Sequence, residues 1–389
     1  MNRKIISHPW SRRQFIHNLS LNAGMAALAM NGMHVFASCN DNNPAGEQNK
    51  TSAMSKGSKK KLGIALVGLG GYAGGQLAPA LQQTEHCYLA GIVTGTPSKI
   101  DTWKSKYNLP DKNIYSYENF DSIKDNPDID IVYVVLPNSM HAEYVIRAAK
   151  AGKHVICEKP MAITVEDCDK MIAACKEAGK MLSIGYRLHF EPYNLEMARL
   201  GQKKVYGNIK KMNAGFGFTI GNPAQWRLKK DLAGGGPLMD LGIYCIQGFC
   251  YTTGMEPIAV RAQEGKKTDM EKFREVEQSL SWQFEFPGGI VAEGKTSYAD
   301  SMNNLRAEAD KGWFEVDPAY NYSGQRGATS DGAMDFKHVN QQAKQMDDFA
   351  DAVMNNRPTP VPGEMGRRDV KYLQAIYKAM RTGERVEIK

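Results

Sequence analysis

A lysine that directly follows an apolar run is the first residue of this chain that could do chemistry. Val155 to Cys157 form the run, and Glu158, Lys159 and Pro160 come next. Short apolar runs bounded by a turn residue are typical of buried parallel strands, whose carboxyl ends carry ligand sites. Pro160 cannot continue a strand ladder, so it fixes where Lys159 points. A cation held there can orient a substrate hydroxyl, although an ordinary strand end with a surface lysine would have the same sequence.

A glycine-rich turn upstream offers a place for a dinucleotide. The apolar run Leu62 to Val67 leads into Gly68-Leu69-Gly70-Gly71-Tyr72-Ala73, which fits G-x-G-x-x-A. A helix is expected over Gln76 to Gln82. Gly68 permits a tight turn, Gly70 lets the backbone approach a pyrophosphate, and the helix N-terminus supplies amide donors. The motif alone is weak, but between a strand and a helix it favours a nucleotide site over a plain turn.

The end of the second expected strand, Cys87 to Thr94, favours NADP over NAD. An NAD enzyme normally places Asp or Glu there to bind the ribose 2′-hydroxyl, whereas this chain has Thr94-Gly95-Thr96-Pro97-Ser98-Lys99. A carboxylate about 4 Å from a 2′-phosphate would cost on the order of 4 kcal/mol at an effective dielectric near 20. Thr94 and Thr96 as donors and Lys99 as a cation suit a phosphate, unless Lys99 is simply a solvated helix residue.

Strands and helices alternate through the first half of the chain, which predicts a parallel, doubly wound sheet. The expected elements are a strand from Ile129 to Leu136, helices from Ala142 to Lys150 and from Val165 to Ala178, and a strand from Met181 to Gly185. Pro137, Asn138 and His141 lie just past a strand end and should line the nicotinamide half of the crevice. For His141, simple packing beside a helix N-terminus remains an open alternative.

The pattern changes after Arg187, where alternating segments predict a mostly antiparallel sheet with one covered face. We expect helices over Glu191 to Leu200, Gln341 to Met354 and Asp369 to Arg381, and strands such as Ile209 to Thr219, Glu277 to Phe286 and Ile290 to Ser297. The predicted fold class is α/β: an N-terminal doubly wound Rossmann domain (61–186) and a C-terminal α+β domain (187–389) with a large, mostly antiparallel sheet. A C-terminal helix should pack back on the Rossmann domain.

The first 60 residues have the composition of a leader and a linker. Ser11-Arg12-Arg13-Gln14-Phe15 precedes a stretch of small and apolar residues, which predicts a twin-arginine export signal over 1–39 and a periplasmic location. Phe36-Ala37-Ser38-Cys39 is similar to a lipobox, so Cys39 is a candidate lipid anchor. A basic start to an amphipathic helix is the alternative. Residues 40–60 are polar and aperiodic, as expected of a flexible arm.

Charge and cysteine usage exclude two classes of function. The chain carries 49 Lys and Arg against 42 Asp and Glu, but nine of the basic and two of the acidic residues fall within 1–61. The remainder balances at 40 of each sign, so nothing favours a nucleic-acid partner. None of the seven cysteines forms a CxxC pair or a cluster with His at metal-ligand spacing, so no metal site is expected.

Several short motifs together resemble the glucose–fructose oxidoreductase (Gfo/Idh/MocA) family. They are Leu136-Pro137-Asn138-Ser139 with His141, Cys157-Glu158-Lys159-Pro160, Gly185-Tyr186-Arg187, Pro223-Ala224-Gln225-Trp226-Arg227-Leu228, Leu232-Ala233-Gly234-Gly235-Gly236 and Leu238-Met239-Asp240-Leu241-Gly242-Ile243-Tyr244. The resemblance covers the chain from Leu62 to its end. Many members have Asp-x-Gly-x-x-His-x-x-Asp in the second domain, whereas this chain keeps Asp240 and Gly242 but has Tyr244 and Gly248 at the later positions.

The resemblance implies roles for particular residues. Lys159, before a proline bond that is often cis, and Tyr244 would flank the reacting carbonyl or hydroxyl, with Tyr244 exchanging the proton and Asp240 orienting both. Tyr244 alone would more often be a packed aromatic residue with a satisfied hydroxyl. The expected cofactor-binding set is Gly68, Leu69, Gly70, Gly71, Tyr72, Thr94, Gly95, Thr96, Lys99, Leu136, Pro137, Asn138, His141, Glu158, Lys159, Arg187, Trp226 and Arg227.

The function implied is oxidation of an aldose to its lactone and reduction of a second sugar on one tightly bound NADP, by a homo-oligomer that assembles through the C-terminal sheet. Three alternatives remain open. The first is a single-substrate aldose dehydrogenase or anhydro-sugar reductase with exchangeable cofactor. The second is a glycosidase that uses bound NAD as a transient oxidant, and the third is a non-catalytic sugar-binding lipoprotein.

Overall fold

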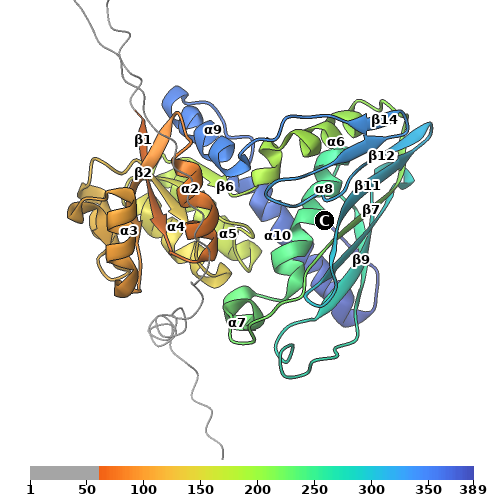
Figure 1. Cartoon of the computed structure of the whole chain (residues 1–389). Coiled ribbons are helices and arrows are strands. Elements are labelled where there is room, and N and C mark those ends of the chain that lie inside the picture. Colours follow the sequence, from red (N-terminus) through yellow and green to blue (C-terminus); the bar gives the residue numbers. More distant parts are fainter. Residues whose placement is uncertain (1–60) are drawn as a thin grey trace, which may run out of the picture.

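Two domains lie side by side in the computed structural model, which describes residues 61–389 (Figure 1). The predicted export signal, the candidate anchor Cys39 and the predicted linker over 40–60 all lie outside the described residues. The first domain holds a six-stranded sheet and the second a nine-stranded sheet. This arrangement confirms the predicted fold class.

The first sheet is parallel throughout, with strand order β3-β2-β1-β4-β5-β6. Its order reverses between β1 and β4, which creates a crevice at the carboxyl ends of those strands. β1, β4 and most of β5 are buried, as the apolar runs predicted. The strands are β1 (Leu62–Val67), β2 (Cys87–Val93), β3 (Ile114–Tyr115), β4 (Ile131–Val134), β5 (His154–Cys157) and β6 (Leu182–Ile184).

Short helical segments connect these strands. The helix after the glycine-rich turn begins at Ala73, earlier than expected, because a π-helical turn precedes its α-helical part. Thr164 caps α5 by accepting a hydrogen bond from the Asp167 amide. The segments are η1 (Ala73–Leu77), α2 (Ala78–Leu81), η2 (Pro97–Lys99), α3 (Ile100–Tyr107), η3 (Asp111–Asn113), η4 (Phe120–Asp125), η5 (Asn138–Met140), α4 (His141–Lys150) and α5 (Val165–Glu177).

The second sheet is antiparallel except for one central parallel pair, β7 with β10. Its strand order is β14-β13-β12-β11-β7-β10-β9-β8-β15. The alternating burial along β9 shows that one face is covered and the other open, as the sequence pattern predicted. The strands are β7 (Ile209–Gly217), β8 (Ala259–Glu264), β9 (Ser279–Glu285), β10 (Val291–Ser297), β11 (Met302–Ala309), β12 (Gly312–Val316), β13 (Gly327–Thr329), β14 (Gly332–Met334) and β15 (Val386–Glu387).

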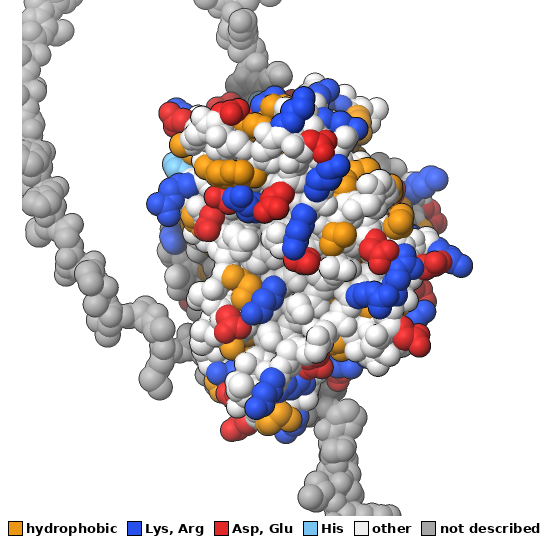
Figure 2. Space-filling view, turned by 90° about the vertical axis from the view of Figure 1, so that its right-hand side faces the viewer, with side chains coloured by type: hydrophobic (Ala, Val, Ile, Leu, Met, Phe, Trp, Pro, Cys, Tyr) orange, Lys and Arg blue, Asp and Glu red, His pale blue; other side chains and the backbone are white. Residues whose placement is uncertain are grey.

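Helices cover the face of this sheet that is turned toward the first domain (Figure 1). They are α6 (Pro192–Gln202), α8 (Ile243–Thr253) and α10 (Gly363–Thr382), with η6 (Arg187–Phe190), η7 (Trp226–Leu228), α7 (Lys230–Ala233), η8 (Leu238–Gly242) and η9 (Pro287–Gly289) in the connections. The opposite face carries charges of both signs in close pairs, such as Lys211 with Glu293 at 2.9 Å and Arg306 with Glu315 at 2.7 Å. Figure 2 shows such interspersed charges on that side of the molecule.

The chain returns to the first domain through α9 (Gln341–Asn355), which packs against α2 and β2. The Asp347 carboxylate accepts hydrogen bonds from the amides of Glu85 and His86, at 2.9 and 2.8 Å. The last long helix, α10, contacts α5 and β6 as well as the second sheet. Both helices therefore join the two domains.

No helix within 61–389 combines the length and apolar character needed to cross a bilayer. In the same residues, no group of three or more His, Cys, Asp or Glu side chains is arranged to hold a metal ion.

Candidate active site

A cavity of about 760 Å³ lies between the domains, at the carboxyl ends of the parallel strands. Its walls contain every predicted site residue except His141. These are Gly68, Leu69, Gly70, Gly71, Tyr72, Thr94, Gly95, Thr96, Lys99, Leu136, Pro137, Asn138, Glu158, Lys159, Arg187, Trp226, Arg227, Asp240 and Tyr244. Residues more than 170 positions apart in sequence thus meet in one cavity.

The glycine-rich turn forms an open cradle in the wall of this cavity. Gly68 has a φ of +97°, and a Cβ there would lie 2.6 Å from the Val135 carbonyl oxygen, so only glycine fits. A Cβ on Gly70 or Gly71 would meet nothing within 4 Å. These two residues therefore leave their backbone accessible to an approaching ligand, as a pyrophosphate group requires.

The end of β2 supplies a cation beside that cradle. Lys99 Nζ donates to the Leu69 carbonyl at 2.7 Å, and desolvation lowers the pKa of this lysine. Thr94 is buried, and its hydroxyl accepts from the Thr96 amide at 3.1 Å. Among the described residues that line the cavity, the only acidic ones are Glu158 and Asp240, and neither lies in the segment from Thr94 to Lys99. The cradle and this lysine fit a dinucleotide that carries an added phosphate.

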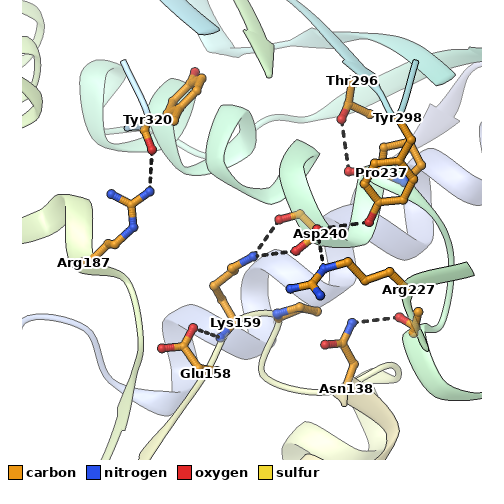
Figure 3. Close-up of polar contacts among 12 residues, drawn as sticks. Asn138, Glu158, Lys159, Arg187, Arg227, Pro237, Asp240, Thr296, Tyr298 and Tyr320 are labelled. Atoms are coloured by element: carbon orange, nitrogen blue, oxygen red, sulfur yellow. Dashed lines mark hydrogen bonds and ion pairs between the residues drawn. The ribbon is translucent and has the colours of Figure 1, made fainter. Parts of the chain in front are cut away.

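Lys159 and Asp240 join the two domains in the wall of the cavity (Figure 3). Lys159 follows β5, and its bond to Pro160 is cis, as the resemblance implied. Its ammonium donates to the Asp240 main-chain oxygen at 2.7 Å and to Oδ1 of the carboxylate at 3.1 Å. Burial lowers the pKa of Lys159, but Tyr244, Asp240 and Glu158 outweigh that effect and the pKa is raised overall. This ammonium is therefore a fixed positive charge.

Asp240 is held by three partners at once. Besides Lys159, Arg227 Nε donates to Oδ2 at 2.9 Å, and the Tyr298 hydroxyl donates to the same oxygen at 3.0 Å (Figure 3). Burial opposes ionisation of Asp240, but Arg227 and Lys159 together hold the pKa of this carboxyl well below its usual range. Asp240 is thus a carboxylate, and it fixes two cations at the cavity wall.

Tyr244 lies one helical turn beyond Asp240, in α8, between two cations. Lys159 Nζ is 4.7 Å from the centre of its ring, and the guanidinium carbon of Arg187 is 5.0 Å from it. The ring packs edge-on against Phe216, with centroids 5.5 Å apart. Such contacts hold the ring while its hydroxyl can exchange a proton with a ligand in the cavity.

Two polar side chains fix the loops on either side of Lys159. Tyr133 donates to Glu158 Oε1 at 2.6 Å, and burial raises the pKa of Glu158. Asn138 Nδ2 donates to the Ala233 carbonyl at 2.8 Å, which ties the loop after β4 to the second domain.

His141 does not line the cavity, so the expectation that it would line the nicotinamide half of the crevice is wrong. Its side chain is fully buried, with Nδ1 2.9 Å from the Pro160 oxygen and Nε2 2.8 Å from the Leu136 oxygen. Desolvation lowers its pKa. The alternative of a packed residue is therefore correct, since His141 braces the two loops that carry Leu136 and Lys159.

The sequence interpretation missed part of the cavity wall. The missed part of the wall includes the segment Tyr320–Ser323, and the sequence also did not reveal Tyr298, which lies outside the wall and donates to Asp240. Arg187 holds this segment by donating to the Tyr320 and Asn321 main-chain oxygens and to Gln341 Oε1. No local sequence pattern indicates these residues, because Tyr298 contacts Asp240 across 58 positions and Arg187 contacts Tyr320 across 133.

Comparisons with known proteins agree with this architecture. Residues 62–186 match the oxidoreductase family GFO_IDH_MocA with its NAD-binding Rossmann fold, and residues 194–317 match the GFO/IDH/MocA C-terminal domain. The chain is 44% identical to the aldose-aldose oxidoreductase from Caulobacter crescentus, whose crystal structure is a complex with glycerol. That similarity covers 84% of this chain and 100% of the other, with a TM-score of 0.82.

Two enzymes are similar at lower identity. D-xylose 1-dehydrogenase [NADP(+)] of Haloarcula marismortui is 28% identical over 343 residues, which are 84% of this chain and 92% of that enzyme. D-glucoside 3-dehydrogenase of Escherichia coli is 29% identical over 279 residues, which are 67% and 79% of the two chains. With both domain models matched and a 44% identical relative fully covered, the chain belongs to the Gfo/Idh/MocA family of oxidoreductases.

Proposed function

We propose that this protein is an NADP-dependent sugar oxidoreductase that oxidises an aldose to its lactone and then reduces a second sugar on the same tightly bound cofactor. One observation carries the proposal. Lys159, Asp240 and Tyr244 converge in the wall of a cavity that the glycine cradle and Lys99 also line. The similarity to an aldose-aldose oxidoreductase and to an NADP-dependent xylose dehydrogenase supports the substrate class and the cofactor.

The chemistry follows from the residues around Lys159. A bound nicotinamide would supply the group that accepts a hydride from the first sugar and gives it to the second. Lys159 donates a hydrogen bond to the sugar oxygen, while the phenolate oxygen of deprotonated Tyr244 takes the proton of the aldose C1 hydroxyl as its C1 hydrogen leaves as hydride. Asp240 keeps Lys159 and Arg227 in place. In the second half-reaction Tyr244 returns the proton to the carbonyl oxygen of the second sugar, so protons and electrons balance over the cycle.

Retention of the cofactor would suit the proposed location of the protein. The twin arginines Arg12 and Arg13 support export in the folded state, and an exported enzyme has no free nicotinamide pool to draw on. Cys39 would add a lipid anchor. Cell fractionation tests both points. Wild-type protein in the cytoplasm would contradict export, and membrane association that is unchanged by Cys39→Ala would contradict the lipid anchor.

A second copy of this chain is the proposed partner of the open sheet face. A shallow groove of about 590 Å³ crosses that face, with Gly215 and Gly294 among its lining residues. The paired charges around the groove, such as Lys211 and Glu293, would form ion pairs with the opposite charges of a symmetry-related copy. Sedimentation velocity at micromolar concentration should show a dimer or tetramer, and a monomer would contradict the proposal.

The central test is a near-ultraviolet spectrum of the purified protein with no nucleotide added. An aldose should raise a reduced-nicotinamide band, and a second sugar should then abolish it. Tyr244→Phe should keep the bound nucleotide but lose turnover, because the proton-exchanging hydroxyl is gone. Unchanged turnover in that variant would contradict the role of Tyr244.

Two other outcomes would favour other functions. A protein without the band that turns over when NADP is added would be a single-substrate dehydrogenase with exchangeable cofactor. Release of sugar from a glycoside with no net redox change would indicate a glycosidase.

A further inference from the structure

Two tyrosines from different domains meet at the rim of the cavity. Tyr72 ends the glycine-rich turn of the first domain, and Tyr322 lies in the loop between β12 and β13 of the second. Their ring centroids are 5.9 Å apart at an interplanar angle of 30°. Both residues line the cavity, yet 45% of Tyr322 is exposed, so its ring forms part of the boundary between cavity and solvent.

The loop that carries Tyr322 is fixed from the junction of the two domains. Arg187 donates to the Asn321 carbonyl at 3.0 Å. Gln341, the first residue of α9, donates from Nε2 to the carbonyls of Asn321 and Tyr322 at 3.1 and 3.2 Å. The loop is therefore pinned by one residue that follows β6 and one that begins the helix returning to the first domain.

The Tyr322 ring has a second partner in Arg187. The guanidinium carbon lies 4.6 Å from the centre of the Tyr322 ring and 5.0 Å from the centre of the Tyr244 ring. Arg187 is 2% exposed and cannot follow the ring if the ring moves outward. Opening the rim at Tyr322 would thus break a cation–π contact and an aromatic contact together.

We propose that Tyr322 and Tyr72 form a clasp over the cofactor cavity, and that opening this clasp limits the release of NADP. The proposal rests on the proposed function, because it explains how a dinucleotide would be kept through two half-reactions. Tyr72 directly follows the glycines that would hold the pyrophosphate, and Tyr322 closes over that turn from the opposite domain.

The test measures the dissociation rate of NADPH from the full-length protein, without any sugar. Bound NADPH is displaced by excess NADP, and its fluorescence is followed in time. Tyr322→Ala should release NADPH about tenfold faster, which is the size expected for one cation–π and one aromatic contact. Tyr322→Phe should leave the rate unchanged, because the clasp uses the ring and not the hydroxyl.

The design includes a matched control and a second route to the same contact. Tyr88→Ala removes a tyrosine of similar exposure, 40%, from β2, where it does not line the cavity, and should leave the rate unchanged. Tyr72→Ala should accelerate release less than Tyr322→Ala does, because it removes only the aromatic contact, and the variant lacking both rings should be little faster than Tyr322→Ala alone, since that contact is shared.

The outcomes separate the clasp from the proposed function. Equal release rates for wild type and Tyr322→Ala would overturn the clasp, whatever the enzyme does. Strictly additive effects of the two alanine substitutions would overturn it as well. Fast release from the wild type, with a further tenfold increase in Tyr322→Ala, would keep the clasp and contradict retention of the cofactor through turnover.

Discussion

Asp240 is the residue at which the charges of the active site meet. Its carboxylate accepts from Lys159 at 3.1 Å, from Arg227 at 2.9 Å and from Tyr298 at 3.0 Å. The side chains of Lys159 and Asp240 are only 11% and 14% exposed, so water does little to screen them. Lys159 and Arg227 therefore share this one carboxylate as their ion-pair partner.

Asp240→Asn should destabilise the protein by about 3–5 kcal/mol at pH 7, because it leaves two largely buried cations without a carboxylate. The depressed pKa of Asp240 sets the pH dependence. Its contribution to stability is present above the unfolded-state pKa of about 3.9 and is lost only as the pH falls through the lower folded-state value. Urea unfolding at pH 7 and at several values below pH 4 measures both effects.

Asp111→Asn is the matched control for that experiment. Asp111 pairs with Lys104, but the two side chains are 83% and 41% exposed. An exposed pair of this kind contributes about 0–1 kcal/mol. A similar loss of stability in both variants would contradict the special position of Asp240.

Single residues of the site were predictable where a local motif carried them. Lys159 follows a strand and precedes a proline, and Asp240 and Tyr244 share one motif, so their positions could be taken from the sequence. Tyr298 could not be, because its role depends on a contact with Asp240 across 58 positions. His141 was misplaced for a related reason: a histidine past a strand end can face the crevice or the loops behind it, and the sequence alone does not distinguish the two.

At the scale of elements, a buried carboxylate, that of Glu277, accepts hydrogen bonds from the start of the helical segment that carries Asp240 and Tyr244. Glu277 Oε2 accepts from the Gly236 amide at 2.9 Å, and Oε1 accepts from the Leu238 amide at 3.1 Å. Tyr377, in α10, donates to Oε1 at 2.8 Å. Glu277 thus satisfies free amides at the start of η8 and joins that helix to α10.

Glu277→Gln should lower kcat about tenfold or more while the KM for NADP stays unchanged. A glutamine offers only one oxygen, so one of the three donors loses its acceptor and the start of η8 shifts. Asp240 and Tyr244 would move with it, whereas the glycine cradle lies in the other domain. Steady-state kinetics with varied sugar and varied NADP separate the two effects.

Glu191→Gln provides the comparison for this positioning role. Glu191 is also a buried carboxylate at a helix start, and its Oε2 accepts from the Asn194 amide at 2.9 Å, but the helix it caps is α6. This variant should lose stability without a specific loss of kcat. Equal losses of kcat in both variants would show that Glu277 acts only through general stability.

The ends of elements were less predictable than their presence. The last helix was expected from Asp369 but begins at Gly363. Its first turns contain Gly363 and Gly366, which weaken the helical signal. Gly366 is required by tertiary packing, since a Cβ there would lie 2.9 Å from the Met161 Cβ. The requirement comes from a neighbour 205 positions away, so no local pattern could reveal it.

At the scale of the molecule, one of three hydrophobic clusters within residues 61–389 spans both domains. A single cluster of buried residues runs from Ala65 and Val134 in the first domain to Phe284 and Val386 in the second. Val361 and Ile376, from the C-terminal segment, belong to the same cluster. The active-site cavity is therefore a gap within one packed unit, and neither domain alone would form it.

The shared cluster predicts that both domains unfold in one transition. Far-ultraviolet circular dichroism and tryptophan fluorescence should give the same urea midpoint, because Trp103 lies in the first domain and Trp282 in the second. Gln345, in α9, donates to the Tyr133 hydroxyl at 2.7 Å, and Tyr133 in turn donates to Glu158. Gln345→Ala removes a buried donor from that chain of hydrogen bonds, so it should lower the free energy of unfolding by about 1–3 kcal/mol. The urea midpoint should fall accordingly, and the two probes should still give the same midpoint. Two separate midpoints in the wild type would mean that the domains are independently stable, and the cavity between them would then have to be assembled by the cofactor.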